Sequence, residues 1–408
     1  MVGILLAFAF HAIAFGSWQG FHGGIDHNRE PFEDFMGPYL RQVQALWRGE
    51  GIQEGYLYPP TLAILLQPLA CLTPGQASWV WLAVLALASL ALFWVGLQWV
   101  GRGRTPVACA YSLVFSLSFP WLHDLHWGQV STVVWALTLI GLYAWSIGKD
   151  GLGCMALSLA IAIKLYPAWF LLVPILQGKR RTVVRVLGLV IGWMWVLPVL
   201  YLGHEATWEF YAELSSRLTA RGPARFLSGE FWGPRMSQFL PAVLSRAWGG
   251  AQGLWLGLAW LLPLAFLGFI LRAAGRRIRG GDPLMGAAML ACALPLIVSP
   301  SWIHYFVWLP WASFAVWGSC QGRLSKSLTT LAMVLGGTPF FFVVGGNPAY
   351  GLCAFPAVAS LLLVLAELSS GPHCYGWIGS RSVLLEAGDG PLDPSPLSGS
   401  APEGVCGL

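Results

Sequence analysis

Long uninterrupted runs of apolar residues recur along the chain, separated by shorter polar segments. The runs at residues 78–100 and 251–271 are each long enough for one helical crossing of a bilayer. Neither has the two-residue alternation of apolar and polar positions that is typical of a transmembrane β-strand. The pattern therefore predicts an all-α polytopic membrane protein and argues against an outer-membrane barrel.

Together with further apolar runs, these segments predict a bundle of about 10 full transmembrane helices. Residues 1–15 lack the basic start of a cleaved signal peptide, so we expect an uncleaved first span there. An apolar segment at residues 59–72 leads into the span at 78–100. The other spans are expected at residues 106–122, 129–147, 182–202, 283–298, 303–320, 327–344 and 350–368.

Basic residues orient these spans, because Lys and Arg accumulate in short cytoplasmic loops. The loops expected inside contain Arg102, Arg104, Lys149, Lys179, Arg180, Arg181, Arg185, Arg272, Arg276, Arg277, Arg279, Arg323 and Lys326. Only one span's worth of apolar sequence separates Lys149 from Lys179. Residues 151–176 are therefore expected to form a pair of half-crossings that turns near Lys164 and Pro167.

This topology places two large loops, residues 17–58 and 203–250, on the extracytoplasmic side. Residues 1–368 then form one integral membrane domain. Residues 369–408 are rich in Gly, Pro and Ser and lack a long apolar run, so we expect a disordered cytoplasmic tail. The unusual polar residues gather in the outward segments, where we expect the functional site.

Composition agrees with this class and excludes others. Hydrophobic residues make up 56% of the chain and charged residues 10%, against about 25% charged residues in a typical soluble domain. The net charge of +5 is dispersed over short loops and does not indicate nucleic-acid binding. The 8 cysteines occur without a CxxC pair, so neither a disulfide framework nor a thiolate metal site is predicted.

The first outward loop contains a run of carboxylates beside the predicted bilayer. Asp34 precedes an amphipathic stretch at residues 39–46, and its carboxylate is expected either to cap that helix or to abstract a proton. Asp26 lies in the same run and is a second candidate base. Asp124 and the histidines near it do not have a recognised metal-ligand spacing, so we predict no metal.

Several basic residues are candidates for binding an anion. Lys164 lies within an apolar segment, where a charge usually faces a cavity or a partner, although it could instead snorkel to a headgroup. His304 begins a span from the outer face, where it would meet a ligand or remain an interfacial histidine. In the second outward loop, three arginines could clamp a phosphate or rest on anionic headgroups: Arg217, Arg221 and Arg225.

Five motifs, in this order, resemble the bacterial membrane glycosyltransferases of family 87, which are GT-C enzymes that use polyprenyl-phosphate sugars. The motifs are EDFMGPYLRQVQALWRGE, YLYPPTLAILLQPLA, DLHWGQVS, AIKLYPAWFLLVPIL and SPSWIHYFVWLP, and the resemblance spans most of residues 26–320. The chain departs from the usual family pattern at Asp124, Ser131 and Tyr305.

The resemblance implies a GT-C-like bundle with outward-facing catalytic loops and assigns roles to matching residues. Asp34 would be the catalytic carboxylate, and Tyr58 would close the first outer loop. The residues implied to bind the donor phosphate or to line its cavity are Gln129, Lys164, Tyr166 and His304. Asp26 and Asp124 remain secondary candidates.

The implied activity is the inverting transfer of a monosaccharide, mannose or arabinose, from a polyprenyl-phosphate donor to a lipid or glycan acceptor. Transfer would occur on the extracytoplasmic face of a bacterial plasma membrane, and because the donor is a substrate, no cofactor is expected. Two alternatives remain. A transporter or flippase of a lipid-linked or anionic substrate would use Lys164 and the outer carboxylates, whereas a non-catalytic membrane scaffold would need neither.

Overall fold

The computed structural model describes residues 32–53, 55–100, 105–220, 237–247, 254–298, 301–320, 322–337 and 354–370. Every regular element in these ranges is a helix, which confirms the predicted all-α class for this part of the chain. Contacts divide the chain into two units, Met1–His373 and Cys374–Leu408. The predicted first span and the tail beyond Ser370 lie outside the described residues.

Three described helices are long and apolar enough to cross a membrane. They are Pro74–Val100 (α5), the continuous helix Arg180–Leu202, and Gly257–Arg279 within α17 (Leu254–Arg279). The helix Arg180–Leu202 comprises α11 (Arg180–Ile191), a π-helical turn η4 (Gly192–Val196) and α12 (Leu197–Leu202). These three correspond to the spans expected at residues 78–100, 182–202 and 251–271.

The third helix differs from its prediction at its C-terminal end. The arginines expected in a cytoplasmic loop instead occupy the last turns of α17, which continues to Arg279. Arginine is a good helix former, so a basic run does not end a helix, whereas the glycines that follow do. Gly281 has a φ of +88°, a conformation that favours glycine.

Prolines divide several other predicted spans into shorter helices. The span expected at residues 106–122 is two helices, α6 (Thr105–Ser116) and α7 (Phe119–Trp127), and α7 has a proline in its first turn. The same occurs between α18 (Pro283–Cys292) and α19 (Leu294–Ile297), and between η5 (Ile303–Phe306) and α20 (Leu309–Ser319). One consequence concerns residues 123–129. The spans expected at residues 106–122 and 129–147 leave a connecting turn there, but most of the segment is helical in α7.

The structure contains the predicted break at Lys164. Helix α9 (Asp150–Ile163) ends there, and Lys164 has extended backbone angles (φ −138°, ψ 133°). A 3₁₀ helix, η3 (Tyr166–Leu171), and α10 (Leu172–Leu176) follow, and Pro167 lies in the first turn of η3. Since proline cannot continue a helix that precedes it, the break has a local cause.

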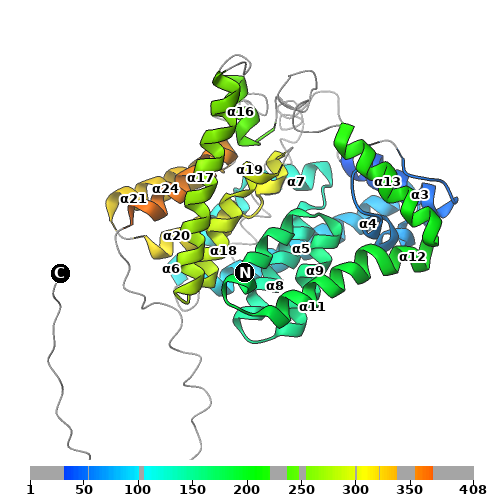
Figure 1. Ribbon diagram of the computed structural model, residues 1–408, viewed down its shortest axis with the longest axis horizontal. Helices are drawn as coiled ribbons and strands as arrows, with labels where there is room; N and C mark the ends of the chain where they lie inside the picture. Colours follow the sequence, from blue (N-terminus) through cyan, green and yellow to red (C-terminus); the bar gives the residue numbers. More distant parts are fainter. Residues whose placement is uncertain are drawn as a thin grey trace, which may run out of the picture. The chain divides into compact units, whose positions relative to one another are not determined.

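The helices beside this break pack tightly. Helix α8 (Ser131–Ser146) lies against both α9 and α5, and α9 also contacts α11 (Figure 1). Gly141 of α8 and Gly153 of α9 permit the approach, because a Cβ at Gly141 would lie 3.2 Å from the carbonyl oxygen of Gly153. Elsewhere α17 packs on α18, and α21 (Arg323–Leu335) packs on α24 (Phe355–Ser369).

Both predicted outward loops contain helices. In the first, a π-helical turn η1 (Phe35–Leu40) leads into α3 (Arg41–Trp47), and α4 (Pro60–Leu65) and η2 (Gln67–Cys71) follow. The apolar face of this segment belongs to a buried cluster with residues of α5, α8 and α9. In the second loop, the described helices are α13 (His204–Ala220) and α16 (Leu240–Ala247).

Candidate functional site

Asp34 does not cap a helix. It lies at the start of η1, its side chain makes no capping hydrogen bond, and it is half-buried. Pro38 lies four residues further on and has no N–H, so the regular α-helical bond to the Asp34 carbonyl is lost in this wider turn. The Asp34 carboxylate instead accepts a hydrogen bond from Gln129, with 2.5 Å between Oδ2 and Nε2.

Two tyrosines hold the other end of the Gln129 amide. The Tyr39 hydroxyl donates to Gln129 Oε1 at 2.8 Å, and the Tyr58 hydroxyl lies 3.3 Å from the same oxygen. The two hydroxyl oxygens are 2.7 Å apart. Burial raises the pKa of both tyrosines well above the usual value for a phenol, so both hydroxyls retain their protons.

The turn between α7 and α8 sets the position of Gln129. It begins with Gly128, whose φ of +64° is in the left-handed region, and whose carbonyl accepts a hydrogen bond from Trp81 at 2.7 Å. A Cβ at Gly128 would lie 2.9 Å from both Phe32 and Phe35. The first loop is also joined to α7 by a backbone hydrogen bond from Phe32 to the carbonyl of His126, at 2.8 Å.

Lys164 is brought to the same place from the end of α9. Its ammonium is buried and donates to Ser131 at 3.0 Å. Nζ also lies 4.3 Å from the ring centroid of Tyr305 and 5.4 Å from that of Tyr58, within range of cation–π attraction. Its charge interacts with the carboxylates of Asp124 and Asp34. Lys164 therefore faces other site residues.

Asp124 belongs to the same cluster but is fully buried. Its Oδ2 accepts hydrogen bonds from the backbone N–H and the hydroxyl of Thr132, at 3.0 and 2.6 Å. Burial raises the pKa of Asp124, although these hydrogen bonds and the nearby Lys164 oppose the shift. Because Asp34 is half-buried and Asp124 is not exposed, Asp34 is more accessible to an acceptor hydroxyl.

His304 and Tyr166 join the cluster through aromatic contacts. The His304 ring stacks on His123 with 5.7 Å between centroids and lies 5.0 Å from the Tyr305 ring. Tyr166 in turn lies 5.5 Å from Tyr305. The charge of Lys164 also reaches His304. Four segments that are distant in sequence thus supply one cluster of polar and aromatic residues.

Arg217 is not part of this cluster in the described residues. Its guanidinium donates to the carbonyl oxygens of Gln53 at 2.7 Å and Ile52 at 3.2 Å, and it pairs with Glu213 one helical turn earlier. These bonds tie α13 to the first loop. Three other predicted candidates lie outside the described residues: Asp26, Arg221 and Arg225.

Sequence reasoning missed several residues of the cluster. The sequence indicates Tyr39 only as the start of an amphipathic stretch and Ser131 and Tyr305 only as departures from a family pattern, and it gives no sign of Thr132. The available signal at Tyr39 was its hydroxyl, which lies on the apolar face of a helix that begins with a carboxylate.

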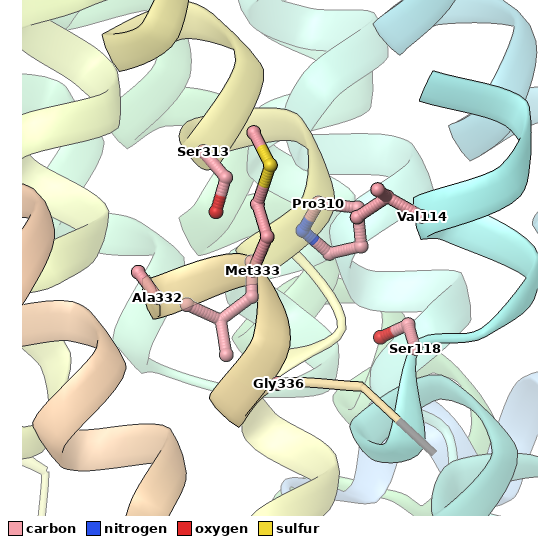
Figure 2. Close-up of a pocket in the computed structure, with 8 residues that line it drawn as sticks. Val114, Ser118, Pro310, Ser313, Ala332, Met333 and Gly336 are labelled. Atoms are coloured by element: carbon pink, nitrogen blue, oxygen red, sulfur yellow. The ribbon is translucent and has the colours of Figure 1, made fainter. Parts of the chain in front are cut away.

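The cluster does not include a metal-binding group in the part of the chain that the structure describes. Within it, no three His, Cys, Asp or Glu side chains form a metal-binding group. Figure 2 shows a pocket of mainly apolar lining between α6, α20 and α21, and none of the candidate residues lines it. Its lining residues are Val114, Ser118, Leu309, Pro310, Ser313, Ala332, Met333 and Gly336.

Comparison with known proteins gives consistent matches. The family model described as Glycosyltransferase family 87 matches residues 56–300. A polyprenol-phosphate-mannose-dependent alpha-(1-2)-phosphatidylinositol pentamannoside mannosyltransferase of Mycolicibacterium smegmatis is 25% identical over 340 residues, which cover 79% of this chain and 76% of the relative. A polyprenol-phosphate-mannose-dependent alpha-(1-2)-phosphatidylinositol mannoside mannosyltransferase of Mycobacterium tuberculosis is 27% identical over 290 residues, covering 64% of this chain and 61% of the relative.

Proposed function

Because the chain belongs to glycosyltransferase family 87, we propose that it transfers a mannosyl residue from a polyprenyl-phosphate donor to a mannosylated lipid acceptor. The activities of both relatives, each a polyprenol-phosphate-mannose-dependent mannosyltransferase, support mannose over arabinose and a phosphatidylinositol mannoside as the acceptor class. Membership of a glycosyltransferase family also sets aside the transporter and scaffold alternatives: the protein is an enzyme.

Asp34 is the proposed general base. The acceptor hydroxyl transfers its proton to the Asp34 carboxylate, and its oxygen forms a bond to the anomeric carbon. The bond from that carbon to the phosphate oxygen breaks with its electron pair remaining on the phosphate. Attack from the face opposite the phosphate inverts the anomeric configuration. A phosphate is a good leaving group, so one base is sufficient.

Lys164 and His304 are the proposed contacts for the donor phosphate, with Tyr58 and Tyr166 lining the cavity. A buried ammonium that faces Tyr305 stabilises the charge that develops on the departing phosphate more strongly than a solvated one would. The contacts of Lys164 support this role over snorkelling, because its Nζ is hydrogen-bonded within the protein.

The proposed topology is a GT-C-like bundle of about 10 crossings with one half-crossing pair at residues 151–176. The break at Lys164 supports the half-crossing, and the arginines of α17 support a cytoplasmic end for that helix. The cluster around Asp34 would then lie at the extracytoplasmic interface, where a lipid-linked donor enters sideways from the bilayer. The tail at residues 369–408 would be cytoplasmic.

The hydrogen bond between Gln129 and Asp34, beside Lys164, is the observation that carries this proposal. The test incubates purified protein in detergent with radiolabelled polyprenyl-phosphate mannose or polyprenyl-phosphate arabinose, together with phosphatidylinositol mannosides. We expect a new mannolipid from the mannose donor alone. Transfer only from the arabinose donor would contradict the sugar assignment, and transfer from neither would contradict the proposed donor and acceptor classes.

A further inference from the structure

The hydrogen bonds around Gln129 run in one direction, toward Asp34. The Tyr39 hydroxyl donates its one proton to Gln129 Oε1, so in its 2.7 Å contact with Tyr58 it accepts. The amide then donates from Nε2 to Asp34 Oδ2. Tyr58 thus donates to Tyr39, Tyr39 to Gln129, and Gln129 to the Asp34 carboxylate, which is the last acceptor of the series.

This direction fixes which end of the amide faces the base. An ionised carboxylate can only accept hydrogen bonds, and a carboxamide oxygen can only accept them too. Turning the amide over would therefore place Gln129 Oε1 against the Asp34 carboxylate, two acceptors with no proton between them, whereas the tyrosine hydroxyls could accept from Nε2 as well as donate to Oε1. With the observed orientation the contacts of the amide to Tyr39 and to Asp34 are both satisfied, and donation into Oε1 polarises the amide and strengthens its N–H as a donor.

The amide has little freedom to leave this arrangement. Gln129 is 6% exposed and Tyr39 is fully buried. The backbone N–H of Gln129 donates to the carbonyl of Asp124 at 2.9 Å, and the preceding Gly128 is held by Trp81. Tyr39 also packs edge-on against Tyr58 and Trp81, with ring centroids 5.1 and 6.2 Å away. Asp34 itself is half-buried, so an immobile donor holds a carboxylate that remains partly accessible.

We propose that Gln129 is a positioning residue, which orients the Asp34 carboxylate toward the acceptor hydroxyl while Tyr39 and Tyr58 fix the orientation of its amide. The inference rests on the proposed function, because it assigns Gln129 a role only through the base. Gln129 itself takes no proton and makes no bond to the sugar. Its effect on the rate comes from holding a reacting group in its productive geometry.

A purely structural role for Gln129 makes a different prediction. If its bonds served only to join the first loop to α8, replacing it would lower the unfolding temperature and would reduce activity to the same extent whether or not a base is present at position 34. A positioning role ties the loss of activity to Asp34.

The test is a double-mutant cycle on the purified protein. The rate of mannosyl transfer from polyprenyl-phosphate mannose is measured for each variant. Gln129→Leu should lower kcat by about 10- to 100-fold, the range for one hydrogen bond to a charged group, and leave KM for the donor unchanged. Gln129→Glu keeps an oxygen for the tyrosines but replaces the N–H donor, so it should lose at least as much. Gln129→Glu also provides the test if Gln129→Leu does not fold.

The control for burial of an amide is Gln67→Leu. Gln67 is also buried, and it donates to the carbonyl of Val43 in the same loop at 3.1 Å without contacting Asp34. Its variant should retain its kcat. Tyr39→Phe should resemble a mild Gln129 variant, and should have no further effect when combined with Gln129→Leu.

The decisive comparison repeats Gln129→Leu in an Asp34→Asn background. We expect less than about a twofold further loss, since interacting residues are non-additive and there is no base left to orient. An equal loss in both backgrounds would overturn the positioning role while leaving Asp34 as the base. Normal turnover by Asp34→Asn alone would be a separate failure, that of the proposed function.

Discussion

At the scale of single residues, Lys164 and Asp34 are held by different kinds of contact. The Lys164 ammonium donates to Ser131, lies beside two aromatic rings, and interacts with the charges of Asp124 and Asp34. A buried ammonium of this kind is suited to bind an anion, and the donor phosphate is the anion that the reaction supplies.

Lys164→Ala should weaken binding of the polyprenyl-phosphate donor by about 2–5 kcal/mol, the cost of truncating one member of a buried charge pair. Lys164→Arg should restore only part of the donor affinity, because a planar guanidinium replaces a compact ammonium. Donor affinity is measured by equilibrium binding of the radiolabelled lipid. Lys326→Ala is the control, since Lys326 also lies over an aromatic ring, Trp317, at 5.9 Å, but is exposed. Unchanged affinity in Lys164→Ala would remove the phosphate role.

The sequence singled out several residues of the cluster but not the hydrogen bonds that organise them. Asp34, Lys164 and His304 stood out because charges and histidines beside apolar runs are uncommon. The partner of Asp34 was not predictable, because Gln129 lies 95 residues away and a carboxylate before a helix is more often a cap. Tyr39 was hidden for the same reason, since its partner is 90 residues away and its ring suits an apolar helix face.

At the scale of elements, the long apolar helices were predictable and their breaks only in part. A continuous run such as α5 has no competing signal. Pro167 gave the break after Lys164, but Pro120 lies inside an apolar stretch that we expected to be one helix, and it instead starts α7. This difference matters, because α7 and the turn after it deliver Asp124 and Gln129 to the site.

The turn at Gly128 gives an element-scale prediction. Gly128→Ala should lower the stability of the folded state by more than the about 1–2 kcal/mol that a left-handed conformation costs a non-glycine residue, because its Cβ also meets Phe32 and Phe35. Transfer activity should fall as well, since Gln129 is the next residue. Thermal unfolding in detergent measures the first effect and turnover the second.

Gly148→Ala provides the matched control. Gly148 has a similar φ, +73°, but nothing lies within 4 Å of an added Cβ. This variant should show only the cost of the backbone conformation and should keep its activity. If both variants lose the same stability and neither loses turnover, the close packing at Gly128 does not position Gln129.

At the scale of the whole molecule, a buried ion pair joins elements that are distant in sequence. Arg277 of α17 donates to Glu367 of α24 at 2.6 Å, and both side chains are buried. Arg277 also lies 3.9 Å from Asp282, the residue that caps α18. The pair thus connects three helices that are not part of the cluster around Asp34.

Glu367→Ala should destabilise the fold by about 3–5 kcal/mol, because it removes the closer of the two carboxylates beside the buried Arg277 charge and leaves only Asp282, at 3.9 Å. The measurement is the unfolding temperature of the purified protein. Glu50→Ala breaks the exposed pair with Arg48 and should leave the unfolding temperature nearly unchanged. Comparable effects of the two variants would show that the buried pair contributes no more than a surface contact.

Membrane topology is the other prediction at this scale. Single cysteines at Lys149 and Gln177 should react with an impermeant thiol reagent only from the cytoplasmic side, whereas one at Leu165 should react from outside or be protected. Leu165 is 55% exposed within the protein itself, so protection there would come from lipid. The native cysteines are first replaced by serine. Labelling at Gln177 from outside would exclude the half-crossing pair.

The central claim is that Asp34 is the general base, and the most direct test is mannosyl transfer by Asp34→Asn. The amide oxygen can still accept the hydrogen bond from Gln129, so folding and donor binding should persist, but it cannot take the acceptor proton. Turnover should fall by about 10²- to 10⁴-fold. Glu50→Gln, an exposed carboxylate change on the same loop, should retain normal turnover. Near-normal transfer by Asp34→Asn, with a large loss in Asp26→Asn or Asp124→Asn instead, would contradict the account and move the base to that residue.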